Sequence, residues 1–237
     1  MQAVLKPSWS PSTTRSYIKT LVAALNLAIK NKRLRTNPLA DVEKPAWGRR
    51  TQILSPSELD SLIAGAREPF LTLLKAMVGT GCRPSEICRL RIEDVNLTRG
   101  TWTVANKTAA QTGAATRTIY LPDDLIESCR SLIGVRTSGP LFLNRAGKPW
   151  SPDTIRLRFA RLRSKLGLSE GAIPYGTRHR FASDAINVHK MDSLVVAKLM
   201  GHANPMMLAK TYFREDGDAM RDAVNRATSH RTKAAEG

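Results

Sequence analysis

The chain has 237 residues, a length that allows one compact domain or two small ones. Lys and Arg number 37 against 20 Asp and Glu, so the formal net charge is +17, while 42% of the residues are hydrophobic. This composition describes a folded protein whose surface favours a polyanion, such as nucleic acid, over a membrane surface. No apolar run approaches the ~20 residues of a membrane-spanning helix, and the first residues lack the apolar core of a signal peptide. We therefore expect no membrane partner.

Cysteine and histidine usage bounds the compartment and the metal chemistry. Three cysteines, Cys82, Cys88 and Cys129, form an odd set without a C-x-x-C pair, which argues against a disulfide framework or a zinc knuckle. The four histidines also lack metal-ligand spacing. We predict a protein of the reducing cytoplasm, with cysteines that are buried packing residues and without a metal site.

The positive charge is concentrated in two segments. Residues 1–50 hold ten basic and two acidic side chains, and residues 142–180 hold nine and two. The stretch between them is nearly neutral, with ten and nine. The two basic segments are therefore the candidates for contact with a polyanion, although a solvated helix face is the alternative explanation for either one alone.

In chain order, the first predicted element is an amphipathic helix. Apolar residues at helical spacing over 10–34 predict it, and the Asn-Pro pair at 37–38 is expected to end it. The basic segment 42–50 contains Pro and Gly and lacks apolar periodicity, which predicts an interdomain linker. Beyond it, the sequence SPSE from Ser55 has the pattern of a capping box, which predicts the start of a second unit.

The second unit is predicted to be mostly helical around one β-hairpin. The hairpin arms are TWTVA at 101–105 and TRTIYLP at 116–122, which flank a polar loop that contains glycine. The predicted fold class is therefore mainly α with a small antiparallel sheet (α+β). Apolar periodicity and capping signals predict helices at 68–81 and within 84–95 and, after the hairpin, at about 123–133, 152–166, 177–189, 192–200, 205–212 and 218–228.

Two arginines lie in unusual local sequence. Arg83 in TGCRPSEICRL and Arg178 in YGTRHRFAS each lie just after a glycine turn, at the predicted start of a helix. Helix N-termini favour anions, and a guanidinium adds planar, bidentate recognition of phosphate oxygens that a lysine does not reproduce. Taken alone, either arginine is better explained as a surface or ion-paired residue, so their significance depends on what accompanies them.

These segments resemble the motifs of the tyrosine recombinase, or phage integrase, family, and the resemblance covers nearly the whole chain. TGCRPSEICRL resembles the first arginine box and contains Arg83, and TRHRFAS resembles the second and contains Arg178. MGHANP resembles the Gly-His box with His202, and Tyr212 in LAKTYFR matches the nucleophile position. Lys107, at the end of the first hairpin arm, matches the family's β-strand lysine. Five matches in the family's order make a chance match remote.

The resemblance implies a reaction and a role for each residue. Tyr212 would attack a DNA phosphate and form a covalent 3′-phosphotyrosine intermediate, while Arg83 and Arg178 stabilise the charge of the transition state. Lys107 would protonate the departing 5′ oxygen, and His202 would donate a hydrogen bond to the phosphate. Because the phosphotyrosine bond keeps the energy for rejoining, such a site-specific recombinase or integrase needs neither ATP nor a metal ion, and we expect no cofactor.

The second arginine box departs from the family at its leading position. The family has His or Lys there, whereas this chain has Tyr175. A phenol can donate a hydrogen bond to a phosphate oxygen, but it is neutral near pH 7 and does not replace the proton transfer of an imidazole. We therefore expect reduced or retuned activity. Two further residues support the site: Glu86, the acidic residue that usually accompanies the first arginine, and His179, expected on a helix face different from that of Arg178.

The resemblance also implies a domain organisation and partners. Residues 1–50 match only the last helix and the linker of the family's core-binding (SAM-like) domain, and residues 51–237 match its catalytic domain. The implied partners are double-stranded DNA recombination sites, on which a homo-oligomer, a tetramer, forms through the C-terminal tail. The implied setting is the cytoplasm, for a bacterial or phage-encoded protein associated with the nucleoid. The candidate DNA contacts are Lys30, Lys32, Arg33, Arg35, Arg156, Arg158, Arg161, Arg163 and Lys165.

Two other functions compete with this interpretation. A catalytically weakened DNA-binding remnant of an integrase would keep the charge and the fold without recombining DNA. An RNA-binding protein is supported by the basic charge alone, because aromatic residues make up only 5% of the chain and no strand rich in aromatic residues is available for base stacking.

Overall fold

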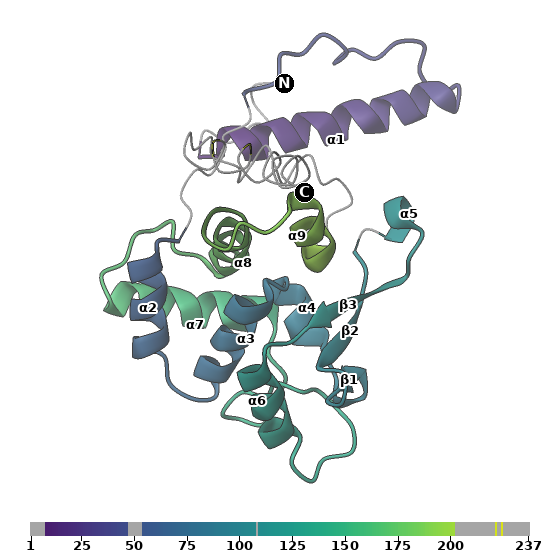
Figure 1. Ribbon diagram of the computed structural model, residues 1–237. Coiled ribbons are helices and arrows are strands. Elements are labelled where there is room, and N and C mark those ends of the chain that lie inside the picture. Colours follow the sequence, from purple (N-terminus) through teal and green to yellow (C-terminus); the bar gives the residue numbers. More distant parts are fainter. Residues whose placement is uncertain (1–7, 47–53, 108, 202–220, 222–223, 225–237) are drawn as a thin grey trace, which may run out of the picture. The chain divides into compact units, whose positions relative to one another are not determined.

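The computed structural model describes residues 8–46, 54–107, 109–201, 221 and 224 (Figure 1). His202, Tyr212 and the two helices predicted at 205–212 and 218–228 lie outside the described residues. The chain divides into two compact units, residues 1–51 and 52–237. Among the described helices, none is both long enough and apolar enough to cross a membrane.

The first unit is built on one long helix, α1 (Pro11–Lys30). The side chain of Ser10 caps its N-terminus by accepting a backbone hydrogen bond from the first turn. The helix ends earlier than predicted because Lys32 takes a left-handed φ of 56° and the backbone N–H of Arg33 closes the helix end on the carbonyl of Ala28. The end of α1 is therefore set by local backbone geometry and not by the Asn-Pro pair farther on.

The segment after α1 turns back along the helix. Nδ2 of Asn37 donates to the carbonyl of Val22 (3.3 Å) and to Oδ1 of Asn26 (2.6 Å). Nη1 of Arg15 donates to the carbonyl of Pro45 (2.8 Å). Within α1 only Ile18 is buried. The described part of this unit is therefore held by polar contacts and has little apolar core.

The second unit combines helices with a three-stranded antiparallel sheet of order β1-β2-β3. This arrangement confirms the predicted mainly α fold class with a small sheet. The elements, in chain order, are α2 (Pro56–Gly65), α3 (Phe70–Thr80), α4 (Pro84–Arg89), the 3-10 turn Ile92–Asp94, β1 (Val95–Asn96), β2 (Thr101–Ala105), α5 (Ala109–Thr112), β3 (Thr116–Tyr120), α6 (Asp123–Ile133), α7 (Pro152–Lys165), α8 (Pro174–Ser183), the π-helical segment Asp184–Val188 and α9 (Ser193–Met200).

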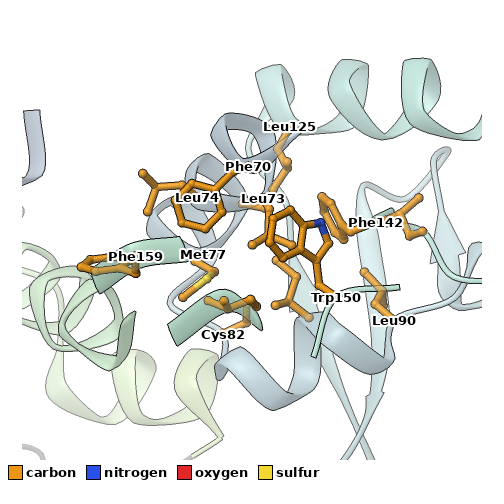
Figure 2. Packing of buried hydrophobic residues seen from close by; sticks show 14 of the residues in the cluster. Phe70, Leu73, Leu74, Met77, Cys82, Leu90, Leu125, Phe142, Trp150 and Phe159 are labelled. Carbon is orange, nitrogen blue, oxygen red and sulfur yellow. The ribbon is translucent and has the colours of Figure 1, made fainter. Parts of the chain in front are cut away.

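The core of the second unit surrounds α3. This helix contacts α2, α4, α6 and α8 and buries side chains on several sides, including Leu73, Leu74 and Met77. Figure 2 shows these side chains among residues from distant segments, such as Phe142 and Trp150. Each large apolar side chain that is fully buried contributes ~1.5–3 kcal/mol. This packing therefore fixes the position of α3 and of the residues that follow its C-terminus.

The hairpin is confirmed, with a short extra strand at its edge. Trp102 on β2 pairs with Ile119 on β3, and both are buried, so this face of the sheet lies on the core. The register ends at the pair Ala105 and Thr116. The connection predicted as a loop contains the single helical turn α5. Lys107 lies in the turn that follows β2, two residues beyond its last position.

The helix of the second arginine box begins earlier than predicted. α8 starts at Pro174, a residue that suits the first turn of a helix because its φ is already helical. Arg178 is therefore the fifth residue of α8 and not the first after a helix start, so the expectation that a helix N-terminus assists it was wrong. After Ser183 the chain continues for five residues as a π-helix, which accounts for the predicted length of the helix up to 189.

Candidate active site

Glu86 is the centre of a buried polar cluster. It is the third residue of α4 and is only 7% exposed. Arg83, the residue before α4, donates to it twice: its backbone N–H reaches Oε2 at 2.7 Å, and its Nη1 reaches Oε1 at 2.7 Å. The two residues of the first arginine box are therefore fixed to each other. Arg83 is the N-cap residue of α4, and Glu86 occupies the third position, from which a Glu side chain accepts the backbone N–H of the N-cap residue in a capping box.

Arg117 on β3 is the residue that the sequence analysis missed. Its Nε donates to Oε1 of Glu86 (3.2 Å) and its Nη2 donates to Oε2 (2.8 Å), a bidentate pair with side chains 7% and 6% exposed. Strand alternation could have found it, because Arg117 lies two residues before the buried Ile119 and so shares its inward face. A charged residue at an inward position requires a partner.

We refer to Arg83, Glu86, Arg117 and Arg178 as the arginine cluster. Burial alone would raise the pKa of the Glu86 carboxyl, but the hydrogen bond and charge of Arg117, together with the hydrogen bonds of Arg83, outweigh burial and hold that pKa below its usual value. Glu86 is therefore ionised at neutral pH, and its charge offsets part of the positive charge that surrounds it.

Arg178 is almost completely buried, with 1% of its surface exposed. Its Nη1 donates to the carbonyl of Gly81 (2.7 Å), and its Nη2 donates to the carbonyl of Met200 (2.6 Å). Among the described residues, its Nε has no hydrogen-bond partner. Burial, followed by the nearby charge of Arg83, lowers the pKa of Arg178 from its ordinary value. A buried guanidinium that is not neutralised in full is suited to meet an anion.

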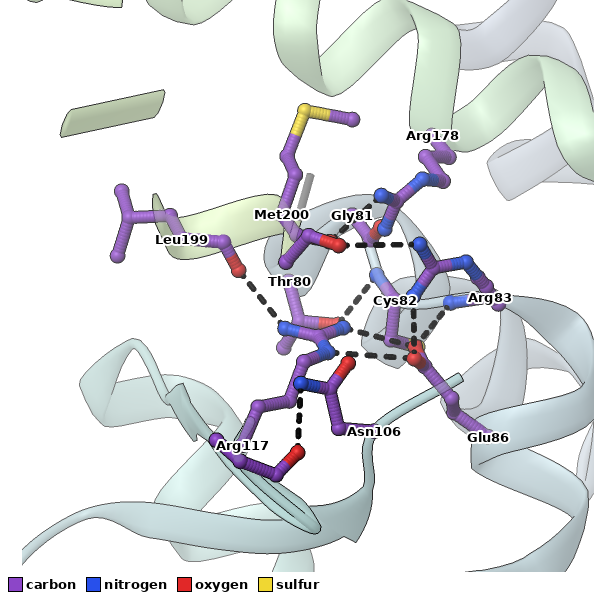
Figure 3. Close-up of polar contacts among 12 residues, drawn as sticks. Thr80, Gly81, Cys82, Arg83, Glu86, Asn106, Arg117, Arg178, Leu199 and Met200 are labelled. Carbon is purple, nitrogen blue, oxygen red and sulfur yellow. Dashed lines mark hydrogen bonds and ion pairs between the residues drawn. The ribbon is translucent and has the colours of Figure 1, made fainter. Parts of the chain in front are cut away.

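The C-terminus of α9 receives three arginines on three consecutive carbonyls. Leu199 accepts from Nη1 of Arg117 (2.9 Å), and Met200 accepts from Arg178 as described. Gly201 accepts from Nη2 of Arg83 (3.2 Å). Figure 3 shows the guanidinium groups of Arg83, Arg117 and Arg178 converging on this helix end; the three residues come from the position before α4, from β3 and from α8. Cations are favourable at this end of a helix, where carbonyls lack intrahelical partners.

Two glycines permit this close approach. Gly201 ends α9 with a φ of +64°, and a Cβ there would lie 2.5 Å from Cδ of Arg117. Gly81 ends α3 with a φ of +58°, and a Cβ there would lie 2.6 Å from the ring of Phe181. Both positions therefore require glycine for two reasons, the left-handed backbone and the absence of space.

Tyr175 and His179 lie one helical turn apart on α8, with ring centroids 5.0 Å apart at 73°. Tyr175 is 40% exposed, whereas burial, and then the charge of Arg178, lowers the pKa of His179. His179 therefore lies on the same helix face as Tyr175, the position at which the sequence departs from the family motif. The sequence motif predicts the face of His179 only relative to Arg178, so this pairing with Tyr175 was not expected.

Lys107 is exposed on the hairpin turn, whereas Glu86 and Arg178 are buried and the side chains of Arg83 and Arg117 are 12% and 7% exposed. The candidate DNA contacts of the first unit, Lys30, Lys32, Arg33 and Arg35, are also exposed.

On α7 the basic residues differ among themselves. This helix buries Ile155, Phe159 and Leu162, so most of its basic side chains face solvent. Arg163 is instead half-buried and donates to the carbonyl of Glu170 (2.8 Å). The exposed basic residues are Arg156, Arg158, Arg161 and Lys165.

The cysteines follow the prediction in most respects. Cys82 and Cys129 are buried and Cys88 is half-buried, and burial raises the pKa of each thiol, to about 11 for Cys82 and about 12 for Cys88. Within the described ranges, no three His, Cys, Asp or Glu side chains gather closely enough to hold a metal ion.

Comparison with known proteins identifies relatives for most of the chain. Residues 52–218 match the model of the phage integrase family. Tyrosine recombinase XerD of Staphylococcus saprophyticus is 26% identical over 212 residues, covering 82% of this chain and 69% of that protein. Tyrosine recombinase XerA of Pyrococcus furiosus is 29% identical over 166 residues, covering 68% of this chain and 54% of that protein. The matched part thus spans between about half and two thirds of these relatives' length.

Solved structures share the fold. An integrase of the Tn1549 transposon, determined in complex with a circular intermediate DNA, superposes with a TM-score of 0.74 at 21% identity over 92% of this chain and 80% of that chain. The XerH site-specific recombinase, bound to a palindromic difH substrate, gives a TM-score of 0.70 at 21% identity over 94% of this chain and 69% of that chain. Because the family model matches residues 52–218, which are most of the chain, the chain belongs to the phage integrase family and carries the catalytic domain fold of the tyrosine recombinases.

Proposed function

We propose that the chain cuts and rejoins DNA at specific sites through a covalent bond between Tyr212 and the 3′ phosphate of the cleaved strand. The observation that carries the proposal is the anchoring of Arg83 and Arg178 on adjacent carbonyls, those of Gly201 and Met200, directly before His202. Because His202 follows Gly201 in the sequence, this anchoring supports a shared role of the three residues on one phosphate.

The chemistry follows from the charge on a phosphodiester, which repels nucleophiles. Arg83 and Arg178 neutralise the non-bridging oxygens as charge accumulates on them in the transition state. The Tyr212 hydroxyl gives up its proton to solvent as its oxygen attacks phosphorus, the bond from phosphorus to the 5′ oxygen breaks, and Lys107 gives that oxygen a proton. Attack by a 5′ hydroxyl on the phosphotyrosine reverses these steps, so the number of phosphodiester bonds is conserved and no ATP is consumed.

His202 and Tyr175 complete the proposed site. His202 donates a hydrogen bond to a phosphate oxygen, since it follows the helix end that the arginines hold. The Tyr175 hydroxyl does the same from α8, in place of the His or Lys of the family. His179 supports the Tyr175 ring through their edge-to-face contact.

We propose double-stranded DNA recombination sites as the partner. The exposed basic residues of α7 contact the phosphate backbone, and the exposed basic residues at the end of α1 do so from the first unit, a part of a core-binding domain. The Tn1549 integrase and XerH structures that resemble this chain contain DNA, and a lambda integrase of the same fold was determined as a dimer on a core site. We propose a tetramer on DNA, with the segment after Phe213 docked on a neighbouring subunit.

Trapping of the covalent intermediate tests the proposal. The substrates are nicked duplexes that together cover the DNA flanking the gene. When the strand is cleaved close to the nick, the short fragment that carries the 5′ hydroxyl dissociates and cannot rejoin. A protein–DNA adduct that survives SDS should therefore accumulate on the duplex that contains the site. Tyr212→Phe should abolish the adduct. Tyr120→Phe is the matched control, because Tyr120 is 63% exposed on β3 and should leave the adduct unchanged. DNA binding without an adduct on any duplex would favour the DNA-binding remnant instead.

A second substrate tests the role of Lys107. Replacing the bridging 5′ oxygen with sulfur gives a leaving group that departs as a thiolate and needs no proton. Lys107→Ala should be slow on ordinary DNA and should recover most of its rate on the sulfur-containing duplex. Arg83→Ala should stay slow on both, because charge stabilisation is still required. Equal loss in the two variants on both substrates would contradict the assignment of Lys107 as the general acid.

A further inference from the structure

Arg117 is a buried charge that the proposed reaction does not use. All three nitrogens of its guanidinium donate to protein acceptors: Nε and Nη2 to Glu86, and Nη1 to the carbonyl of Leu199. Its side chain is only 7% exposed. Arg178 differs, because its Nε has no hydrogen-bond partner among the described residues. With every guanidinium nitrogen engaged by protein, Arg117 is not arranged as a phosphate ligand, and its role must lie in what it holds.

The bidentate pair with Glu86 fixes the orientation of a carboxylate that also holds Arg83. Both oxygens of Glu86 accept from both arginines: Oε1 from Nε of Arg117 and Nη1 of Arg83, and Oε2 from Nη2 of Arg117 and the backbone of Arg83. With its two oxygens occupied in this way, the carboxylate has a single favourable orientation. A planar guanidinium can impose it and an ammonium cannot.

The same side chain reaches the end of α9. Its Nη1 donates to the carbonyl of Leu199, and its Cδ would lie only 2.5 Å from a Cβ added at Gly201. The residue after Gly201 is His202. Arg117 therefore contacts the helix end that immediately precedes one of the proposed phosphate-binding residues.

Arg117 also belongs to the hairpin that carries Lys107. It lies on β3 opposite Val104, and the register continues to the pair Ala105 and Thr116. The backbone N–H of Asn106 donates to the carbonyl of Ala115 at 2.8 Å, so the pairing extends to the residue before Lys107. The position of this part of the hairpin is thus tied to the position of Arg117.

We propose that Arg117 is a positioning residue for DNA cleavage, which holds the first arginine box, the Lys107 hairpin and the end of α9 in one arrangement. This inference rests on the proposed function, because it assigns Arg117 to the site where Arg83, Lys107 and His202 act. Arg117 touches no reacting atom. Its effect is on the geometry of the groups that do.

The activity test separates the rate of cleavage from DNA binding. Single-turnover adduct formation is measured on the nicked duplex that carries the site, over a range of concentrations of the full chain. In Arg117→Met the rate at saturation should fall about 100-fold, the loss expected from a displacement of about 1 Å in a catalytic group. The half-saturating concentration should change by less than about threefold. Arg117→Lys, which keeps the charge without the planar fork, should give an intermediate rate.

Arg99→Met is the matched control, because Arg99 is exposed in the turn between β1 and β2. It should match the wild-type chain in both quantities. Urea titration of each variant gives its folded fraction, and where Arg117→Met does not fold, Arg117→Lys carries the test. An unchanged rate at saturation in the folded variants, or a loss that equals the unfolded fraction, would overturn the proposal.

Amide hydrogen exchange provides a readout that does not depend on activity. In Arg117→Met the amides at the end of α9, which include the Gly201 N–H bonded to the Lys198 carbonyl, should exchange about tenfold faster or more, while those of α3 should not change. Unchanged exchange in α9 overturns the proposal even if the wild-type chain is active. Faster exchange together with an inactive wild-type chain would instead reject the proposed function, and with it the catalytic purpose of the positioning.

Discussion

The arginines of the cluster and those of α7 show opposite uses of one residue type. In the cluster, Arg83, Arg117 and Arg178 are buried or nearly so, and each donates to fixed protein acceptors. On α7, Arg158 and Arg161 are exposed. A desolvated charge is costly unless it is paired, whereas an exposed charge is free to meet a mobile partner. Stability should therefore depend on the first set, and attraction of DNA on the second.

The strongest test of this difference removes the carboxylate at the centre of the arginine cluster. Glu86→Ala leaves Arg83 and Arg117 without their shared anion in a buried site, so the free energy of unfolding should fall by about 3–5 kcal/mol. Urea unfolding of the full chain measures it. The control is Glu93→Ala, which breaks an ion pair with Arg91 whose side chains are 44% and 53% exposed and should cost far less, because solvent screens an exposed pair. Equal losses would mean that burial does not distinguish the two ion pairs.

Substitution of the glycine at the end of α9 should lower stability less than Glu86→Ala does, and the chain offers a more closely matched control for it. Gly201→Ala adds a Cβ at a φ of +64° and against Arg117, so it should cost about 1–3 kcal/mol and slow adduct formation. Gly147→Ala adds a Cβ at a φ of +69° with open space around it. It should carry only the backbone penalty of about 1 kcal/mol. If the two variants lose the same stability, the contact with Arg117 contributes nothing beyond the left-handed backbone.

The acid dependence of stability tests the charge of Glu86. Its pKa in the folded protein is held below the ordinary value, so the folded state binds fewer protons than the unfolded state. The resulting stability is fully present above the ordinary pKa of 4.5, which Glu86 has in the unfolded chain, and is lost as the pH falls through the lower folded value. The difference in unfolding free energy between the wild-type chain and Glu86→Gln should therefore shrink as the pH falls from 7 to 3. A constant difference would mean that Glu86 does not titrate in this range.

Much of the fold was predictable because it depends on local signals. The capping box at Ser55 and Glu58 forms as predicted, and the β-rich runs at 101–105 and 116–120 pair as a hairpin. α8 begins earlier than predicted because Pro174 suits the first turn of a helix, whereas the predicted start at 177 rests on the glycine that precedes it. Short elements such as α5 carry too little sequence to give a periodic signal.

The residues of the candidate site that a motif encodes could be named from the sequence. Arg83 and Glu86 of the first arginine box are hydrogen-bonded to each other, and Arg83 and Arg178 donate to adjacent carbonyls at the end of α9. The contribution of Arg117 is not local, because its partners lie 31 residues before it and 82 residues after it. Contacts between residues so far apart in the sequence depend on how the elements pack, and no spacing rule within a single sequence records them.

The smallest change in stability is expected for substitutions on α7, and these substitutions test whether its exposed arginines attract DNA. Arg158→Ala together with Arg161→Ala removes two exposed charges, so the free energy of unfolding should stay within about 0.5 kcal/mol of the wild-type value. Each arginine that contacts a DNA phosphate contributes about 0.9 to the slope of log affinity against log salt. Titration of a labelled duplex at several salt concentrations should therefore show the slope reduced by up to about 2.

Arg163→Ala on the same helix is the control, because Arg163 donates to the carbonyl of Glu170. This variant should lower stability by about 1 kcal/mol, the typical net contribution of a hydrogen bond, and should leave the salt slope unchanged. The two variants then separate charges that hold the protein from charges that meet DNA, within a single helix. An unchanged slope in the double variant would leave α7 as a solvated helix face, and the attraction of DNA would then have to come from the basic residues at the end of α1.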